Sequence, residues 1–169
     1  MCLGLFGLAL VACEAPGEEE AQADCSLLGE FEVELGDGHG AFMGLEDGAS
    51  PELIHGIQGG THLVLGAWLH TPDPLERYTL GLLAEVGQEP CDVEGCASWT
   101  LSGELDIELD GSFERVAIAG PGEVELHNLF LVVNAWETAP HRRLRLDVWD
   151  ACDRHASSVR TFANIENAP

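Results

Sequence analysis

Apolar and polar residues alternate along several segments after residue 27, as expected of β-strands with one buried and one exposed face. No segment carries a long apolar stripe at helical spacing. Turn signals such as Gly-Asp-Gly at 36–38 separate the alternating segments. The pattern predicts an all-β chain. Its expected inward-facing residues are Phe31, Val33, Leu35, Tyr78, Leu80, Leu82, Ala84, Val86, Leu105, Ile107, Leu109, Leu144, Leu146 and Val148.

Three further segments predict how the strands connect. Residues 104–109 and 116–118 flank an Asp-Gly turn and are expected to pair as a hairpin. The segment 129–133, with the sequence LFLVV, is apolar at every position, which is typical of a central strand covered on both faces. Residues 157–165 are expected to return as the last strand after the turn at 150–156.

The stretch at 55–70, HGIQGGTHLVLGAWLH, holds three of the seven histidines. Its adjacent glycines at 59–60 favour a two-residue hairpin loop, because glycine accepts the positive φ of primed turns. In that register the core face of the second strand carries Leu63, Leu65, Ala67 and Leu69. The outer face is partly apolar, and we expect it to be a contact surface. Its apolar residues are Ile57, Val64 and Trp68.

The same register makes His55 and His62 diagonal neighbours, with Cα atoms about 7–8 Å apart. Two imidazoles can converge on Zn²⁺ or Cu²⁺ over that distance, with a third ligand from elsewhere. His70 is excluded from the pair, because eight residues of strand separate it from His62 by about 26 Å. Partly exposed polar histidines are the competing interpretation. Candidates for the third ligand include His39, His127, His141 and His155.

The chain carries 30 acidic and seven basic residues, for a net charge of −23. This excludes charge-driven binding to nucleic acid or to an anionic membrane surface. The carboxylates of 104–110 supply oxygen ligands for Ca²⁺, but Ala117 stands where an EF-hand requires a bidentate Glu. Motifs of nucleotide-binding proteins, serine hydrolases and zinc proteases are absent from the sequence. No catalytic residue is assigned, and we expect a non-enzymatic protein.

Residues 3–12 are apolar, too few to span a bilayer but typical of a signal-peptide core. The next residues complete the sequence Leu10-Val11-Ala12-Cys13, which resembles the lipobox of bacterial lipoproteins. The resemblance implies a signal peptide at 1–12, lipidation of Cys13 and anchoring in a membrane, the outer membrane of a Gram-negative bacterium. No basic residue precedes the apolar core, so we expect the natural start to lie upstream.

Residues 13–26 after the cleavage site are expected to form a flexible tether, because 14–24 are acidic and lack large apolar side chains. Residues 27–169 are expected to form one domain. Four further cysteines in an oxidising compartment predict two disulfides, with three possible connectivities. We favour the pairs Cys91–Cys96 and Cys25–Cys152. A zinc site is the alternative, although a single C-x4-C spacing with distant partners is a weak signal for it.

About seven to nine short strands separated by turns indicate an antiparallel β-sandwich. The final hairpin with its Asp-rich turn is similar to the end of an immunoglobulin-like domain of bacterial surface proteins. The resemblance covers residues 27–166 and is architectural, because the Cys…Trp…Cys spacing of antibody domains is not recognisable.

The expected function is a non-enzymatic lipoprotein that presents a binding or structural module to a protein partner. It would do so in the periplasm or at the cell surface. The alternative is an exported carrier or metallo-enzyme that binds Zn or Cu at His55 and His62.

Overall fold

The computed structural model describes Cys25 and residues 29–163, except for 41, 47–49, 57–58, 71–76, 93–94, 111–115 and 121. The predicted signal peptide, the lipidation of Cys13 and most of the tether lie outside the described residues, as does Ile57. Within the part that is described, no helix is long and apolar enough to cross a membrane.

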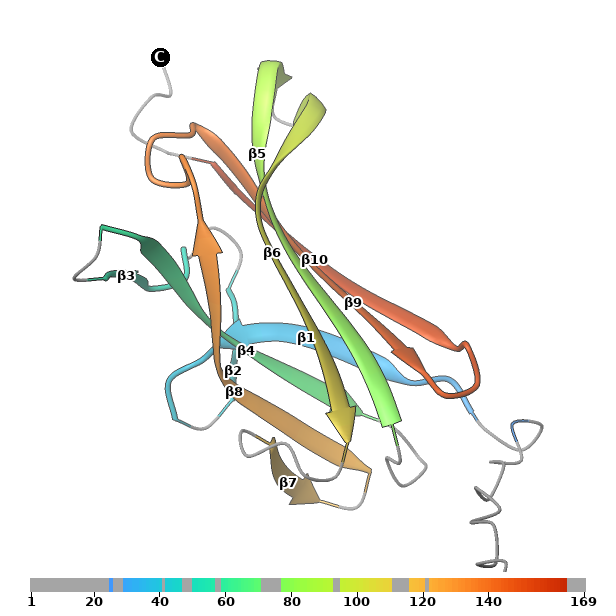
Figure 1. Cartoon of the computed structure of the whole chain (residues 1–169). Coiled ribbons are helices and arrows are strands. Elements are labelled where there is room, and N and C mark those ends of the chain that lie inside the picture. The colour runs from blue at the N-terminus through green and yellow to red at the C-terminus, as the bar shows by residue number, and fades with distance from the viewer. Residues whose placement is uncertain are drawn as a thin grey trace, which may run out of the picture.

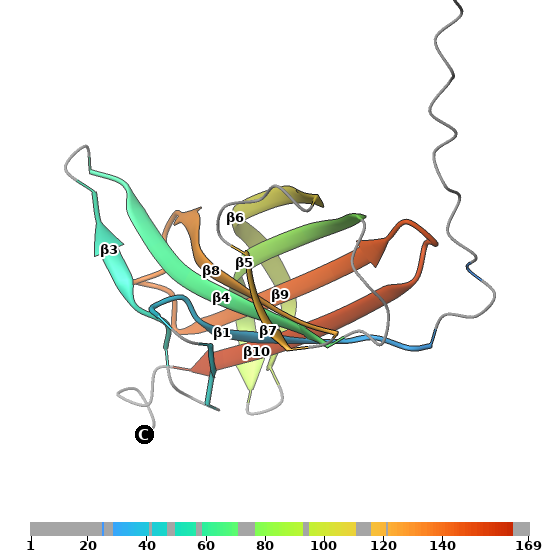
Figure 2. The same cartoon turned by 90° about the horizontal axis from the view of Figure 1, so that it is seen from below.

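The described strands are all antiparallel and form two sheets that face each other (Figures 1 and 2). Sheet A has the order β2-β1-β4-β8-β7, with β3 also paired to β4, and sheet B has the order β10-β9-β5-β6. The strands of sheet A are β1 (Glu32–Asp37), β2 (Met43–Gly44), β3 (Leu53–His55), β4 (Thr61–His70), β7 (Val116–Gly120) and β8 (Glu123–Val133). Those of sheet B are β5 (Arg77–Asp92), β6 (Gly95–Asp110), β9 (His141–Asp150) and β10 (His155–Ala163).

The prediction of an all-β chain in two sheets is confirmed. Ten strands are described, one more than the upper end of the predicted range, because β2 and β3 are short pieces of two and three residues. β3 and β1 pair with successive parts of the same edge of β4.

The core lies between the two sheets and follows the predicted alternation. In β5, for example, Leu80, Leu82 and Ala84 are fully buried. Burying a leucine side chain contributes about 1.5–3 kcal/mol, so these rows are the main source of stability. The other fully buried core residues that the structure describes are Leu35, Leu63, Leu65, Ala67, Leu69, Leu126, Leu129, Leu131, Trp136, Leu144, Leu146, Val148 and Phe162.

The two sheets also meet along both of their sides. On one side, the backbone N–H of Leu35 in β1 donates to the Ser158 hydroxyl of β10 at 3.3 Å. On the other, the Ser102 hydroxyl of β6 donates to the Asn134 carbonyl just after β8 at 2.5 Å. Gly103 permits this approach, because a Cβ there would collide with the carbonyl oxygen of Val132. The core is therefore closed at the sides as well as covered on its faces.

The predicted hairpin between residues 104–109 and 116–118 is wrong. β6 pairs with β5 in sheet B, whereas β7 pairs with β8 in sheet A. β6 and β7, although consecutive along the chain, therefore lie in different sheets. An Asp-Gly turn signal is local, and it does not distinguish a hairpin from a crossover.

The prediction that 129–133 is covered on both faces is also wrong. Leu129 and Leu131 point into the core, but Phe130 and Val132 are 41% and 53% exposed on the outer face of sheet A. Apolar residues at every position do not require two covered faces, because much of a folded protein's surface is apolar.

Candidate functional site

The hairpin in the histidine-rich stretch exists, but its register differs from the prediction. Ile54 lies opposite His62 in the β3–β4 ladder. The backbone N–H of Gly56 donates to the Gly60 carbonyl at 2.7 Å, and the ladder ends at the pair His55–Thr61, so Gly59 and Gly60 do not form a two-residue turn between the strands. The predicted register was therefore wrong by three positions. A shift by an odd number of residues moves the side chains of one strand to the opposite face relative to those of its partner strand.

This register separates His55 from His62, because they lie on opposite faces of the hairpin. The His55 ring instead lies 3.1 Å from Glu137, with its side chain 68% exposed. His62 lies against the loop, 3.2 Å from where a Cβ on Gly56 would be. The diagonal contact on which the His55–His62 metal hypothesis depended is absent from this ladder. His70 lies at the far end of β4, as expected.

The predicted contact surface of Ile57, Val64 and Trp68 requires correction. Val64 is fully buried, so it is not available to a partner. It lies in the middle of sheet A, and its backbone N–H donates to the carbonyl of Glu52, just before β3. Trp68 is half-buried and stacks between Phe42 and His70 at ring-centroid distances of 6.5 and 5.5 Å. Among the side chains that the structure describes, the large exposed apolar residues of this face are Ile54, Phe130 and Val132.

Both predicted disulfides are present, Cys25–Cys152 and Cys91–Cys96. The first joins residues 127 positions apart and the second joins residues five positions apart. Two disulfides indicate an oxidising, extracytoplasmic location.

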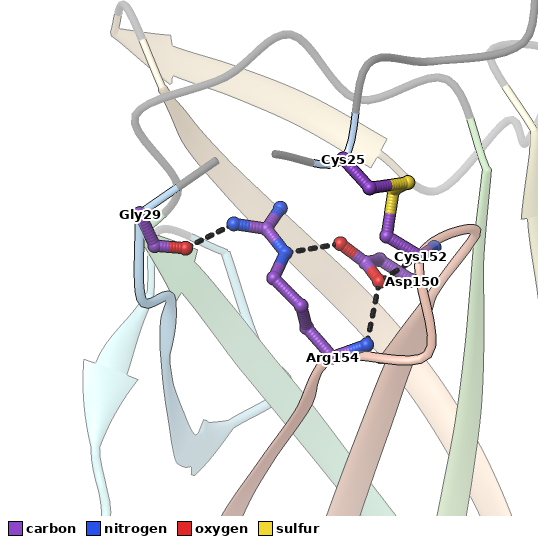
Figure 3. The surroundings of a disulfide bond; sticks show 5 residues. All are labelled: Cys25, Gly29, Asp150, Cys152 and Arg154. Atoms are coloured by element: carbon purple, nitrogen blue, oxygen red, sulfur yellow. Dashed lines mark hydrogen bonds and ion pairs between the residues drawn. A yellow bond between two sulfur atoms is a disulfide. The ribbon is translucent and has the colours of Figure 1, made fainter. Parts of the chain in front are cut away.

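The Cys25–Cys152 disulfide lies in a turn that is ordered by one carboxylate (Figure 3). Asp150 accepts hydrogen bonds from the backbone N–H groups of Cys152 and Arg154, both at 2.9 Å. Its other oxygen lies 2.5 Å from the Arg154 guanidinium, which also donates to the carbonyl of Gly29. The segment before β1 is therefore fastened to the β9–β10 turn at two points, one covalent and one polar.

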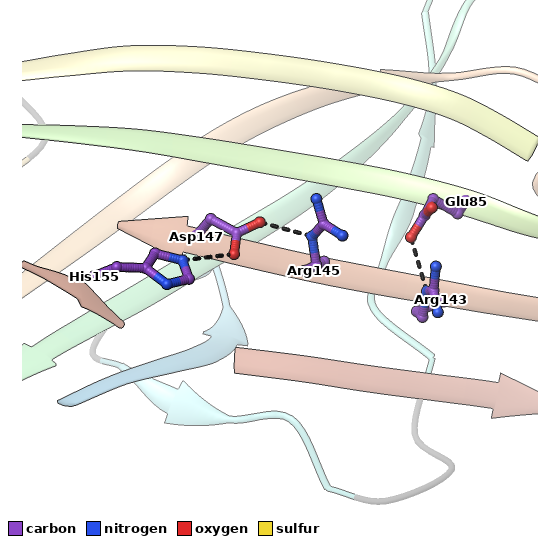
Figure 4. Close-up of polar contacts among 5 residues, drawn as sticks. All are labelled: Glu85, Arg143, Arg145, Asp147 and His155. Atoms are coloured by element: carbon purple, nitrogen blue, oxygen red, sulfur yellow. Dashed lines mark hydrogen bonds and ion pairs between the residues drawn. The ribbon is translucent and has the colours of Figure 1, made fainter. Parts of the chain in front are cut away.

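The outer face of sheet B carries a row of paired charges (Figure 4). Asp147, whose side chain is only 9% exposed, lies 2.6 Å from Arg145 and 2.9 Å from the His155 ring. Arg143 lies 2.8 Å from Glu85 on the neighbouring strand. Each of these pairs joins side chains on one face, where charge-assisted hydrogen bonds fix their geometry.

Aromatic rings flank these charges. Trp149 is 40% exposed and stacks on His155 with ring centroids 4.9 Å apart. The guanidinium of Arg143 lies 4.4 Å from the centre of the Trp99 ring. Exposed Trp beside ordered polar groups is common at recognition surfaces. The sequence alternation predicted the outward direction of Arg143, Arg145 and Asp147, but not their partners.

A histidine of β9 lies beside the second disulfide, at the end of the β5–β6 hairpin. Cys91 lies opposite Cys96 in the ladder, and His141 at the start of β9 lies beside them. One ligand atom from each of the three lies within 4.8 Å of the others. Among the residues that the structure describes, this is the only such group of His, Cys, Asp or Glu side chains. The disulfide has no thiolate, so the group is not a metal site while the bridge is closed.

The alternation of β9 explains why His141 reaches this position. Arg142 points inward, 8% exposed and 5.8 Å from the centre of the Trp136 ring, so His141 points outward. Burial lowers the pKa of Arg142 from its ordinary value. The sequence could suggest His141 only as one of several possible ligands, because nothing local relates it to cysteines some 45 positions earlier.

No protein-family model matches the sequence, and no curated protein matches it. Among solved structures, the chain is similar to DesR, a β-glucosidase from Streptomyces venezuelae whose structure was determined in complex with D-glucose. The match has 13% sequence identity and a TM-score of 0.32, and it covers 80% of this chain but 15% of the other. The chain thus corresponds to a small part of that enzyme's length. This distant structural match to part of a β-glucosidase identifies no family.

Proposed function

We propose that this protein is an exported, membrane-anchored lipoprotein that presents a β-sandwich as a non-enzymatic binding or structural module. The observation that carries the proposal is the Cys25–Cys152 disulfide. It requires an oxidising compartment, and it fastens the chain that follows the lipobox-like sequence to the folded domain.

The position of this disulfide sets which end of the domain carries the tether. Cys25 follows Cys13 by 12 residues, which reach at most about 40 Å when fully extended. A lipid on Cys13 would therefore keep the β9–β10 turn within about 40 Å of the membrane. The opposite end of β9, at His141, lies about 30 Å away along the strand. The end of the β5–β6 hairpin beside His141 thus lies far from the point at which the tether joins the domain (Figure 1).

The strand order supports a more specific proposal, that the module is immunoglobulin-like. The order β1-β4-β8-β7 corresponds to the A-B-E-D sheet of that fold, and β10-β9-β5-β6 corresponds to G-F-C-C′. The contact between Leu35 and Ser158 fits the proximity of the first and last strands. Neither disulfide takes the place of the inter-sheet bridge of antibody domains, because one lies in a turn and the other within a hairpin.

Incorporation of a palmitate analogue in the native host tests the anchor. We expect labelling of the full chain, loss of label in Cys13→Ser, and unchanged labelling in Cys2→Ser, the matched control. Detergent extraction should be needed to release the wild type but not Cys13→Ser from membranes. Equal labelling of wild type and Cys13→Ser would disprove lipidation at this cysteine.

A further inference from the structure

We propose that Cys91, Cys96 and His141 form a redox-gated metal site, closed as a disulfide when oxidised and open to Zn²⁺ when reduced. This inference goes beyond the anchoring function and does not depend on it. It also differs from the His55–His62 hypothesis, whose two histidines lie on opposite faces of a hairpin.

The geometry brings together two sulfurs and one imidazole from three strands. Cys91 and Cys96 are directly opposite on β5 and β6, and His141 begins the neighbouring β9. Their ligand atoms lie within 4.8 Å of one another. In tetrahedral zinc sites, bond lengths of about 2.0–2.3 Å place ligand atoms roughly 3.3–3.8 Å apart. Opening the disulfide and rotating the side chains would therefore bring the three atoms to ligating distances without moving the strands.

Gly87 makes room for this group. It lies on β5 beside both partners, and a Cβ there would collide with Cys96 Sγ and lie 3.0 Å from the Cβ of His141. A glycine at this position lets the sulfur and the imidazole share one side of the sheet. All three ligating residues are half-buried, so they are shielded from bulk water yet accessible to an ion.

The ligand chemistry suits a soft d¹⁰ cation. Two thiolates and a neutral imidazole are ligands that zinc prefers, and the two thiolates cancel the charge of Zn²⁺. Three protein ligands leave one position for water or another ligand, as in zinc sites that are not purely structural.

Opening this disulfide need not unfold the domain. It links residues five positions apart, so it restricts the unfolded chain far less than Cys25–Cys152 does. The β5–β6 ladder continues beyond it from Gln88 back to Arg77. The rest of the hairpin therefore stays paired when the bridge is broken.

The redox step requires a dithiol reductant, of the kind supplied by thiol–disulfide oxidoreductases. The reductant transfers two electrons and two protons to the Cys91–Cys96 bond and becomes a disulfide itself. Binding of Zn²⁺ then displaces the two thiol protons. At a pH where the imidazole is already neutral and the thiols are still protonated, the affinity should rise about 100-fold per pH unit, because two protons leave for each ion bound.

Titration of the detergent-solubilised full chain with Zn²⁺ against a chromophoric chelator tests the proposal. The oxidised protein should bind no stoichiometric zinc, and the protein reduced with a phosphine should bind one equivalent. Loss of an outer-shell partner weakens metal binding by roughly 10–100-fold. Loss of a direct ligand should weaken it at least as much, so we expect this effect in Cys91→Ser/Cys96→Ser and in His141→Gln. Co²⁺ bound to the reduced protein should show sulfur-to-metal charge-transfer absorption that is lost in the double serine variant.

Two controls separate this site from other thiols and histidines. Cys25→Ser/Cys152→Ser and His55→Gln should still bind one equivalent after reduction. The proposal is overturned if the reduced wild type binds no zinc, or if His141→Gln binds as tightly as wild type. Circular dichroism would reveal a cysteine variant that fails to fold. His141→Gln retains both disulfides, so its zinc affinity tests the proposal even in that case.

Discussion

Ile54 lies directly opposite His62 across the β3–β4 ladder, so His55 lies opposite Thr61 and faces away from His62. Cysteines at directly opposed positions are close enough to form a disulfide, whereas those displaced along the strand are not. We therefore expect His55→Cys/Thr61→Cys to form a new disulfide on air oxidation, measured by intact mass and thiol titration.

The matched control is His55→Cys/Val64→Cys, which would be opposed only with a two-residue Gly-Gly loop. It should keep two free thiols. A disulfide in the second variant and none in the first would show that the hairpin has the other register.

The two native disulfides should differ in their contributions to stability. By the chain-entropy relation, a 127-residue separation gives about 5 kcal/mol and a five-residue separation about 2 kcal/mol. In urea denaturation, Cys25→Ser/Cys152→Ser should therefore lower the free energy of unfolding by more than Cys91→Ser/Cys96→Ser does. A larger loss in the hairpin variant would contradict this account, and it would also weaken the case for local opening of that bridge.

The close approach of the two sheets at Gly103 makes this position sensitive to a single methyl group. Gly103→Ala would force a Cβ into the carbonyl oxygen of Val132, and we expect a loss of about 1–3 kcal/mol. Gly81→Ala is the matched control, because its Cβ would lie 3.4 Å from Asp106 and 3.5 Å from Trp149, with no backbone atom near. Thermal unfolding should show a large decrease in Tm for the first variant and little change for the second. Equal effects would show that the sheets do not meet at Gly103.

The charge row on sheet B should depend on Asp147. This carboxylate is nearly buried and accepts from both Arg145 and His155, so Asp147→Asn should cost about 1–3 kcal/mol. Asp106→Asn, on an exposed position of β6 in the same sheet, should change stability by less than about 0.5 kcal/mol. Urea denaturation of both variants compares them directly. A loss that is no greater for Asp147→Asn than for Asp106→Asn would mean that the paired charges contribute little.

Much of the fold follows from residue alternation, because burying one face of a strand requires it. Leu80, Leu82 and Ala84 are fully buried as predicted, whereas Thr79 is exposed and Leu83 and Glu85 are half-buried. The two disulfides were also predictable, because one cysteine pair closes a short loop and the other two cysteines lie near the ends of the domain. These inferences need no knowledge of which strands are neighbours.

The remaining features depend on contacts between distant segments. Gly59 and Gly60 favour a tight turn, but the ladder ends at the pairing of His55 with Thr61, which excludes a two-residue turn made of these glycines. The position of His141 beside Cys91 and Cys96 depends on β9 pairing with β5, which no local pattern encodes. A sequence can therefore indicate which residues face inward while leaving open which side chains meet on the outside.

Mass spectrometry of a non-reduced tryptic digest of the protein isolated from membranes tests the lipid on Cys13 and the Cys25–Cys152 disulfide together. Trypsin cuts only after arginine here, because the chain contains no lysine. We expect a peptide 13–77 that carries lipid on Cys13 and is joined through Cys25–Cys152 to the peptide 146–154. Retention of residues 1–12 without lipid, or separate peptides with free Cys25 and Cys152 thiols, would contradict it.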